Sequence, residues 1–364
     1  MMKTRIKDLS YITILVFLTL SCQNNSDIKK INFDSFPEEK AIEGKICKME
    51  KLPLRLYQIE IVDSLIVAFD FYRKNKRLFI FNANNFNLID DAGVMGNGPK
   101  ELSRPFFFDI NKKNRTIWIG DRGRLKIFGF SIDSIIQSEK ERPSFECNIS
   151  KNIKKNFTRI RYYNDSLFAI TSYLSKGNPS LVELMDRNGK IVDSLGAYPQ
   201  KRKKEEPKFG FSMLWEHNIR VLDNKNILVS FRNFDKIMQI DSKGNTVFTS
   251  SGPDNIKQKR IFHENKIWIH LKDAPRGYGS CYTYRKYIYC LYSGDSFFIN
   301  EDYNTRQQYY KHIHVFDEKG KPVIRYNLNH EIRDFVIDKK NNRIVGISTS
   351  TPEPFIIFPL PQIN

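Results

Sequence analysis

Residues Ile219–Thr249 read IRVLDNKNILVSFRNFDKIMQIDSKGNTVFT. Four short apolar runs alternate here with three polar turns that are rich in Asn, Asp, Lys and Gly. Such runs, separated by residues that favour tight turns, are typical of antiparallel strands in a meander. The stretch therefore predicts four antiparallel strands within 31 residues.

Both kinds of turn in this stretch recur along the chain. The Asp-x-x-Gly turn at Asp241–Gly244 recurs at Asp186–Gly189 and Asp317–Gly320, each time between two apolar runs. The turn that precedes the second strand recurs as well, and it predicts second strands that begin near Leu65, Thr116, Leu167, Ile227, Tyr287 and Ile344. Successive starting points lie 51, 51, 60, 60 and 57 residues apart.

A repeat of this length with four strands per unit is typical of a β-propeller. A lone meander leaves both faces uncovered, whereas blades packed around an axis cover them and leave only short outer edges. We therefore expect an all-β, six-bladed β-propeller with four-stranded antiparallel blades over residues 41–364. A β-sandwich pair would not reuse the same two turns at this step, and a solenoid needs shorter, stricter repeats.

Two stretches do not fit the repeat simply. The last unit shows only three strands, the last of them at Phe355–Phe358, so we expect Ala41–Lys48 to supply its outer strand. Residues Ser251–Gly279 contain an additional strand-like run, Lys266–Leu271, which makes this blade boundary the least certain part of the pattern.

The N-terminus has the pattern of an export signal. Lys3, Arg5 and Lys7 precede an apolar run of 12 residues, Leu9–Leu20. A membrane-spanning helix needs about 20 apolar residues, so this run is interpreted as the core of a signal peptide over residues 1–21. The following Ser21-Cys22 resembles the lipobox of bacterial lipoproteins, although Thr19 stands where that family favours Leu.

The resemblance implies cleavage before Cys22 and attachment of acyl chains such as palmitate at its thiol. Two or three chains hold a protein at a membrane firmly, whereas a single chain holds it weakly. Residues 22–40 are expected to form a lipidated tether. Gln23, rather than Asp, follows the cysteine, which in some Gram-negative bacteria favours sorting to the outer membrane. The alternative is a cysteine buried in an uncleaved anchor helix.

Composition indicates a globular protein with an excess of basic residues. The 364 residues are 40% hydrophobic, enough for a core, and carry a formal net charge of +18. Removing residues 1–21 takes away three basic residues and one acidic residue, which leaves +16. This excess suits anionic partners, although a solvated lysine-rich surface is the simpler interpretation, also for Lys201–Lys204. Nucleic acid is not expected as a partner of an exported protein.

Four cysteines remain after Cys22: Cys47, Cys147, Cys281 and Cys290. The chain has no C-x-x-C motif, which argues against a thiol–disulfide oxidoreductase or a zinc ribbon. Cys281 and Cys290 lie nine residues apart in strand-like sequence and could face each other across a hairpin. An exported compartment permits such a bond.

No pattern identifies a catalytic, cofactor-binding or metal-binding residue. His312-x-His314 places two rings on one face of a strand, but the sequence marks no third metal ligand. Asp63-Ser64 and Asp165-Ser166 lie at expected turns, and there is no G-x-S-x-G motif for a nucleophilic serine. A tyrosine-rich run could contact a carbohydrate or a protein or simply form blade core; its members are Tyr282, Tyr284, Tyr287, Tyr289 and Tyr292.

Several of these motifs together are similar to a known family. Gly96–Glu101 (GNGPKE) resembles the G-x-G-P-x-E loop of TolB-like six-bladed propeller lipoproteins of gut-type Gram-negative bacteria. Tyr287–Gly294, His314–Gly320 and Phe335–Asp338 resemble the C-terminal half of that family. The loop lacks the Lys-Ser/Thr ending of a phosphate-binding loop, so its glycines are interpreted as a tight inter-blade turn. The resemblance implies an exported lipoprotein of the cell envelope with no established reaction.

These observations favour a membrane-anchored binding or scaffold module for a protein or glycan partner, with no catalysis and no cofactor. The alternative is a propeller hydrolase or lyase with a metal or polar site on the central axis. Fold alone does not separate the two, but the inner-strand residues that face the axis do.

The lipobox resemblance predicts that the protein isolated from membranes starts at Cys22 and carries the mass of its acyl chains. Mass spectrometry of the wild type and of Cys22→Ala checks this. An unmodified wild-type N-terminus would contradict the anchor.

Overall fold

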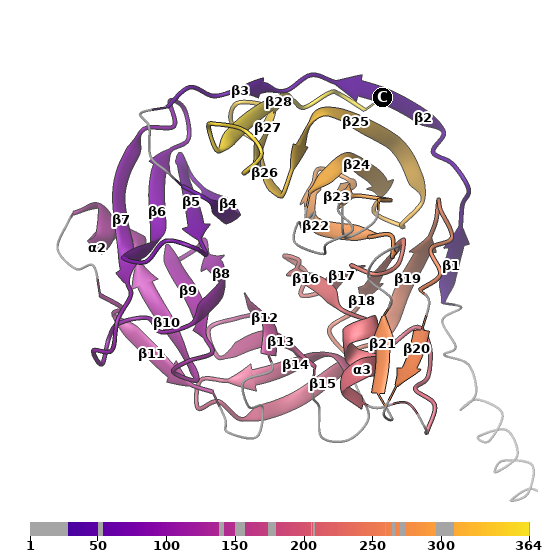
Figure 1. Ribbon diagram of the computed structural model, residues 1–364, viewed down its shortest axis with the longest axis horizontal. Helices are drawn as coiled ribbons and strands as arrows, with labels where there is room; N and C mark the ends of the chain where they lie inside the picture. The colour runs from indigo at the N-terminus through magenta and orange to yellow at the C-terminus, as the bar shows by residue number, and fades with distance from the viewer. Residues whose placement is uncertain are drawn as a thin grey trace, which may run out of the picture.

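The computed structural model describes residues 28–49, 54–137, 142–149, 157–173, 180–204, 206, 208–258, 260–263, 266–269, 274–295 and 309–363. Six antiparallel sheets surround a central axis (Figure 1). The fold is therefore the six-bladed β-propeller that the repeat predicts.

The blades follow one another along the chain, each running from an inner to an outer strand. Blade one contains β4 (Leu56–Val62), β5 (Leu65–Asp70), β6 (Lys76–Asn82) and β7 (Leu88–Val94). Blade two contains β8 (Pro105–Asn111), β9 (Thr116–Asp121), β10 (Lys126–Ser131) and β11 (Phe145–Asn148). Blade three contains β12 (Phe157–Tyr162), β13 (Leu167–Ser172), β14 (Ser180–Asp186) and β15 (Ile191–Ala197).

The second half of the ring has the same arrangement. Blade four contains β16 (His217–Val221), β17 (Ile227–Phe231), β18 (Lys236–Ile240) and β19 (Thr246–Ser251). Blade five contains β22 (Tyr278–Tyr284), β23 (Tyr287–Tyr292), β24 (Tyr310–Asp317) and β25 (Pro322–Ile332). Blade six contains β26 (Asp334–Asp338), β27 (Arg343–Ile347), β28 (Phe355–Pro359) and β3 (Lys45–Ile46). Five second strands begin at the expected residues, and β27 begins one residue earlier than expected.

The turns explain why the sequence pattern is so regular. The carboxylate of Asp241 accepts backbone N–H bonds from Lys243 at 2.9 Å and Asn245 at 2.8 Å. Gly244 has a φ of +84°, a conformation that residues with a Cβ rarely adopt. Asp317 bonds to its own turn in the same way. The Asp-x-x-Gly motif is thus a local structural code for the link between the third and fourth strands.

The N-terminal segment closes the ring, as expected, and also extends around its outside. In β3, Lys45 and Ile46 pair with Ile357 and Ile356 of β28 in the last blade. Ala41 and Ile42 belong instead to β2 (Glu38–Ile42), which adds a parallel fifth strand to β25. We call β1, β2 and β3 together the N-terminal belt, which runs along the outer edges of blades four, five and six (Figure 1).

The belt corrects the expected domain boundary. Residues 22–40 were expected to form a tether, but β1 (Lys29–Asn32) pairs in parallel with β19 of blade four. The outer edges of β19 and β25 present backbone groups that can pair with another strand. Because this pairing uses backbone hydrogen bonds, the polar N-terminal segment can add to these edges. The propeller therefore includes residues from Lys29 onward, and Cys22 lies outside the described residues.

Buried aromatic contacts fix the belt to the blades. The Phe36 side chain is only 6% exposed, and its ring centroid lies 4.4 Å from His314 and 5.6 Å from Phe316. Phe33 packs edge-on against Phe36 and Phe316. The belt is therefore part of the hydrophobic core between blades four and five.

Additional elements lie outside the regular blades. The strand-like run near Lys266 forms a two-stranded hairpin, β20 (Arg260–His263) with β21 (Lys266–Ile269), between blades four and five. Two short helices, α2 (Ile132–Ile136) and α3 (Lys208–Leu214), lie in connections. Within the described residues, no helix has the length and apolar character that crossing a membrane requires.

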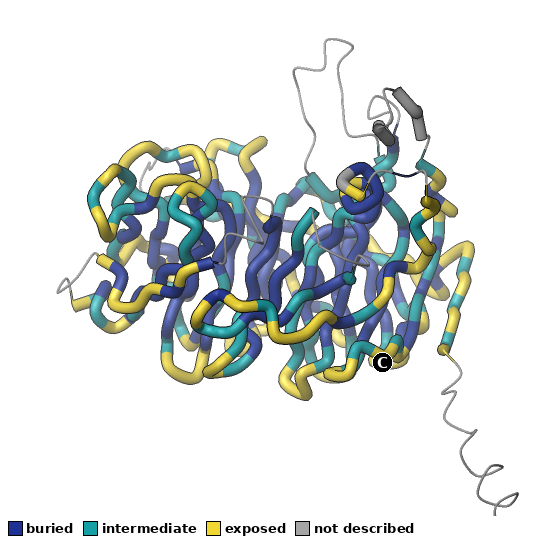
Figure 2. The backbone as a smooth tube through the Cα atoms, turned by 90° about the horizontal axis from the view of Figure 1, so that it is seen from below, coloured by how far each residue is buried: buried dark blue, intermediate teal, exposed yellow. Residues whose placement is uncertain are grey.

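Two faces of the disc are defined by the turns that form them. The lower face holds the turns between first and second strands and between third and fourth strands. The upper face holds the turns between second and third strands and the connections from blade to blade. Seen edge-on, the strands are largely buried in the middle, and the C-terminus lies at the lower face (Figure 2).

Replacing Phe36 with alanine is expected to lower the free energy of unfolding by about 3 kcal/mol, because it empties a buried aromatic site that ties the belt to two blades. The matched control is Phe145→Ala, at a side chain that is 58% exposed, for which we expect a change below about 1 kcal/mol. Denaturant titration of both variants measures this. Equal losses would show that the belt is not part of the cooperative core.

Candidate functional site

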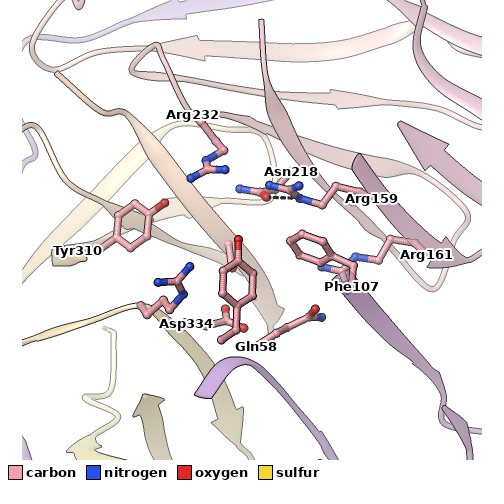
Figure 3. Close-up of a pocket in the computed structure, with 11 residues that line it drawn as sticks. Gln58, Phe107, Arg159, Arg161, Asn218, Arg232, Tyr310 and Asp334 are labelled. Carbon is pink, nitrogen blue, oxygen red and sulfur yellow. Dashed lines mark hydrogen bonds between the residues drawn. The ribbon is translucent and has the colours of Figure 1, made fainter. Parts of the chain in front are cut away.

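A polar pocket lies at the upper end of the central axis. Its position follows from topology: each inner strand starts at the upper face, and Tyr57, Arg159 and Asn218 are early residues of β4, β12 and β16. Figure 3 shows side chains from several blades converging there. The lining residues are Tyr57, Gln58, Phe107, Arg159, Arg161, Asn218, Arg232, Ser280, Tyr310, Arg333 and Asp334. The cavity has a volume of about 50 Å³.

One carboxylate holds two guanidinium groups at this end of the axis. Arg232 Nη1 lies 2.7 Å and Arg159 Nη2 3.6 Å from Glu216 Oε1. Arg159 Nε donates a hydrogen bond of 2.7 Å to Asn218. Burial alone would raise the pKa of Glu216, but Arg232, Arg159 and Arg276 hold it down at about 2. Glu216 is therefore ionised at neutral pH.

Four guanidinium groups lie at this end of the axis. We call Arg159, Arg232, Arg276 and Arg333 the axial arginine cluster. Burial and the adjacent Arg232 lower the pKa of Arg276 to about 10 and also lower the pKa of Arg159. Burial raises the pKa of Asp334, the one acidic side chain that lines the pocket, to about 6. Burial and the proximity of neighbouring guanidinium groups thus lower the pKa values of two members of the cluster.

Aromatic rings hold the guanidinium groups in place. Arg333 Cζ lies 3.8 Å from the centroid of the Tyr57 ring, and Arg159 Cζ lies 4.0 Å from that of Phe107. Cations are attracted to the faces of such rings. Burial alone would raise the pKa of Tyr57, but Arg333, Arg232 and Arg159 lower it below its ordinary value. The same guanidinium groups thus lower the pKa of the phenol.

Ion pairs connect the charges further down the axis. Arg220 Nη2 lies 2.6 Å from Glu60 Oε1, and Arg161 Nη1 lies 3.2 Å from Asp109 Oδ1. The Arg220 guanidinium also lies 3.6 Å above the Tyr282 ring. Lys112 interacts electrostatically with Glu60 and Asp109 as well. Carboxylates therefore pair directly with the guanidinium groups of this layer.

The two histidines of the sequence motif do lie on one face of β24, with ring centroids 6.3 Å apart. His314 is fully buried beside Tyr278, whose hydroxyl lies 3.1 Å from its Nδ1. Arg325 Nη2 lies 3.0 Å from His312 Nε2, and a cation there opposes metal binding. The described part of the chain contains no group of three His, Cys, Asp or Glu side chains placed to hold a metal ion.

The other residues singled out from the sequence have structural roles. Cys281 and Cys290 lie directly opposite each other on β22 and β23 and form a disulfide. In the tyrosine-rich run, Tyr282, Tyr289 and Tyr292 are buried as blade core. Asp165 accepts a hydrogen bond of 2.6 Å from the Tyr162 hydroxyl beside its turn.

The GNGPKE loop forms a self-contained turn. Gly98 N–H donates to the Glu101 carboxylate at 2.7 Å, and Arg124 Nη2 donates to the carbonyls of Gly96 at 3.1 Å and Gly98 at 2.8 Å. A Cβ at Gly96 would collide with that carboxylate. The loop is therefore an inter-blade turn, as its sequence predicts.

Sequence reasoning missed the axial arginine cluster. Arg159 lies in β12, and the other three members lie next to β17, β22 and β26 of the following blades. More than forty residues separate each member from the next. One signal was available: Arg232 directly follows the second strand of its blade, as Arg122 follows β9. Such positions lie at the upper face in every blade, so an arginine there indicates a side chain close to the upper end of the axis.

The fold and the pocket define a six-bladed propeller with a basic axial site. The sequence matches the TolB-like 6-blade propeller-like family over residues 33–340, and the chain belongs to this family. No curated protein matches the sequence.

Two solved structures are similar in fold. A predicted exported protein from Bacteroides fragilis NCTC 9343 has a TM-score of 0.57 and 12% identity, with 91% of this chain and 98% of that chain covered. A member of the DUF4221 family from Bacteroides vulgatus ATCC 8482 has a TM-score of 0.58 and 11% identity, with 89% and 96% covered. At these identities the similarity concerns the fold alone.

Replacing Glu216 with glutamine is expected to reduce stability at neutral pH by roughly 3 kcal/mol, the free energy that corresponds to its lowered pKa. Because the folded pKa is lowered, this contribution is complete above the unfolded value near 4.5 and disappears as the pH falls towards 2. Denaturant titrations of wild type and Glu216→Gln from pH 7 to pH 2.5 measure the difference.

The control for this experiment is Asp223→Asn, at an exposed carboxylate on a lower turn, for which a change within about 0.5 kcal/mol is expected. A Glu216→Gln penalty that does not decrease in acid would contradict the ion-pair account.

Proposed function

We propose that this chain is a tethered binding module whose axial arginine cluster binds an anionic group of a glycan or protein partner. The observation that carries the proposal is the convergence of guanidinium groups on a polar pocket at the upper end of the axis, where Arg159 and Arg232 share Glu216. The lowered pKa of Arg276 supports it, because burial and the adjacent Arg232 cause that shift.

Electrostatics gives the physical reason. Buried charges are costly unless they are paired, and guanidinium groups form short, charge-assisted hydrogen bonds with carboxylate, sulfate or phosphate oxygens. The pKa values of Arg159 and Arg276 are lowered, which is the expected effect of burial and of neighbouring guanidinium groups. An anion that binds here would reduce the repulsion between these guanidinium groups. Part of the binding free energy therefore comes from the relief of that repulsion.

The proposed localisation is the cell envelope of a Gram-negative bacterium, where acyl chains on Cys22 would anchor the protein in the outer membrane. The export pattern of residues 1–21 and the family membership support it. A short tether would keep the propeller next to the membrane and its upper face available to a partner.

A second candidate is the lyase alternative. Tyr57 lies beside Arg333, and its pKa is lowered, which suits a base that removes a proton next to a bound carboxylate. In a uronate chain, loss of that proton and breakage of the neighbouring C–O bond form a C=C bond, and the leaving glycosidic oxygen takes up a proton to become a hydroxyl. Ultraviolet absorbance of the unsaturated product would detect this reaction, and loss of the signal in Tyr57→Phe would assign it.

Binding is tested with glucuronate and inorganic sulfate as probes, with glucose as the uncharged control, by calorimetry at fixed ionic strength. We expect at least one anion to bind and glucose not to bind. Arg333→Gln should weaken the affinity about tenfold or more, because charge-assisted bonds are the strong ones. The control Lys203→Gln, at an exposed upper-face residue outside the pocket, should bind as the wild type does.

Ligand-free stability separates this proposal from a structural role. Because Arg333 also packs over the Tyr57 ring, Arg333→Gln is expected to lose about 1 kcal/mol of ligand-free stability, whereas its affinity should be lost even under conditions in which the variant is fully folded. The proposal is wrong if no anion binds, or if the two variants have equal affinities.

A further inference from the structure

The N-terminal belt joins the propeller at its lower face. Lys29 pairs with Phe248 and Asn32 with Ser251, so β1 runs parallel to β19. β19 starts just after the Asp241–Gly244 turn, which belongs to the lower face, and it ends at the connection towards blade five on the upper face. The first residue of the belt therefore lies at the opposite face from the axial arginine cluster.

Little chain separates this point from the proposed anchor. Seven residue steps lead from Cys22 to Lys29, which span at most about 25 Å when fully extended. A six-residue strand such as β19 is about 20 Å long. To turn its upper face to the membrane, the propeller would have to use almost all of this reach on running back along its own edge. The short segment thus favours an orientation with the lower face towards the lipid.

The lower face beside this point is basic. Six exposed Lys or Arg side chains lie on the lower turns of blades four and five: Lys225, Lys243, Arg285, Lys286, Lys319 and Lys321. We call them the lower basic patch. On the same turns only Asp223 and Glu318 are exposed acids, while the carboxylates of Asp241 and Asp317 accept hydrogen bonds within their own turns.

Part of this patch lies directly beside the belt. Ser250 of β19 donates a hydrogen bond of 2.5 Å to the carbonyl of Gly320, so the turn with Lys319 and Lys321 packs against the strand that pairs with β1. Charge and anchor therefore meet at one edge of the disc.

We propose that the lower basic patch docks on the anionic phosphate head groups of the membrane that holds Cys22, so that the axial arginine cluster faces away from the lipid. The orientation rests on the anchor in the proposed function, whereas the charge contact does not. Each basic residue near an anionic surface adds about fivefold to membrane affinity, and this attraction decreases within about 10 Å in ordinary salt. Patch and anchor act together, because a chain held by lipid keeps the patch within that distance.

The experiment uses the full chain purified from membranes and mixed with vesicles of phosphatidylcholine, with or without phosphatidylglycerol. A fluorophore is placed at Ser242→Cys on the lower face or at Lys203→Cys on the upper face, in a Cys47→Ser background. Quenching by a lipid-borne quencher reports the distance of each label from the membrane. We expect stronger quenching of the Ser242 label than of the Lys203 label in both kinds of vesicle, and a further several-fold increase for the Ser242 label only in anionic vesicles at low salt.

Charge reversal tests the contact itself. Lys319→Glu with Lys321→Glu should reduce quenching of the lower label to its value in neutral vesicles. The matched control, Lys203→Glu with Lys204→Glu on the upper face, should leave it unchanged in a chain labelled at Ser242→Cys. Equal quenching of the upper and lower labels, or equal effects of the two reversals, would overturn the proposal.

Flotation with the vesicles separates docking from anchoring. An acylated chain floats with both vesicle types in high salt, whatever the labels report. If the chain is not acylated, flotation only with anionic vesicles in low salt, lost in the Lys319→Glu and Lys321→Glu variant, still supports the patch. Absence of flotation under every condition would overturn docking and anchor together.

Discussion

Closure of the ring by the N-terminal belt is the constraint on which the rest of the structure depends. Lys45 and Ile46 supply the outer strand of blade six, whose other three strands come from the C-terminal part of the chain. Because this strand closes the ring, all six inner strands face one axis. Arg159 and Arg232 can then meet one carboxylate although they are far apart in sequence. The site is a product of the closed circle and not of any single blade.

The axis has two layers with different electrostatic designs. In the deeper layer Arg220 pairs with Glu60 and Arg161 with Asp109. In the upper layer Arg159 and Arg232 share Glu216, and aromatic rings also pack against Arg159 and Arg333. Guanidinium groups that lie close together repel one another, and such a cost in stability is expected where a ligand binds.

The sequence predicted the fold well because its information is local. An Asp and a Gly within four residues determine a turn such as Asp241–Gly244, and apolar runs between such turns determine strands. The parallel pairing of β1 and β2 was not predictable in this way, because polar residues add to a free strand edge without an alternating pattern. The sequence of the β20–β21 hairpin has the same pattern as the strands of the blades. Only its position, outside the six blades, distinguishes it from them.

The site was less predictable for the same reason. His312 and His314 share a face, as their spacing requires, but only the fold brings Arg325 next to them. The axial arginines come from separate blades, and no single motif contains two of them. Local patterns therefore predict strands and turns, while the convergence of side chains at an axis needs the three-dimensional arrangement.

The central claim is that the upper axis holds an anion between guanidinium groups. The most direct measurement is anomalous diffraction from crystals soaked in selenate. The account predicts a selenium peak within hydrogen-bonding distance of Arg232 or Arg333, at the upper end of the axis. An axis without a peak, in crystals where selenate occupies only surface lysines, would contradict it.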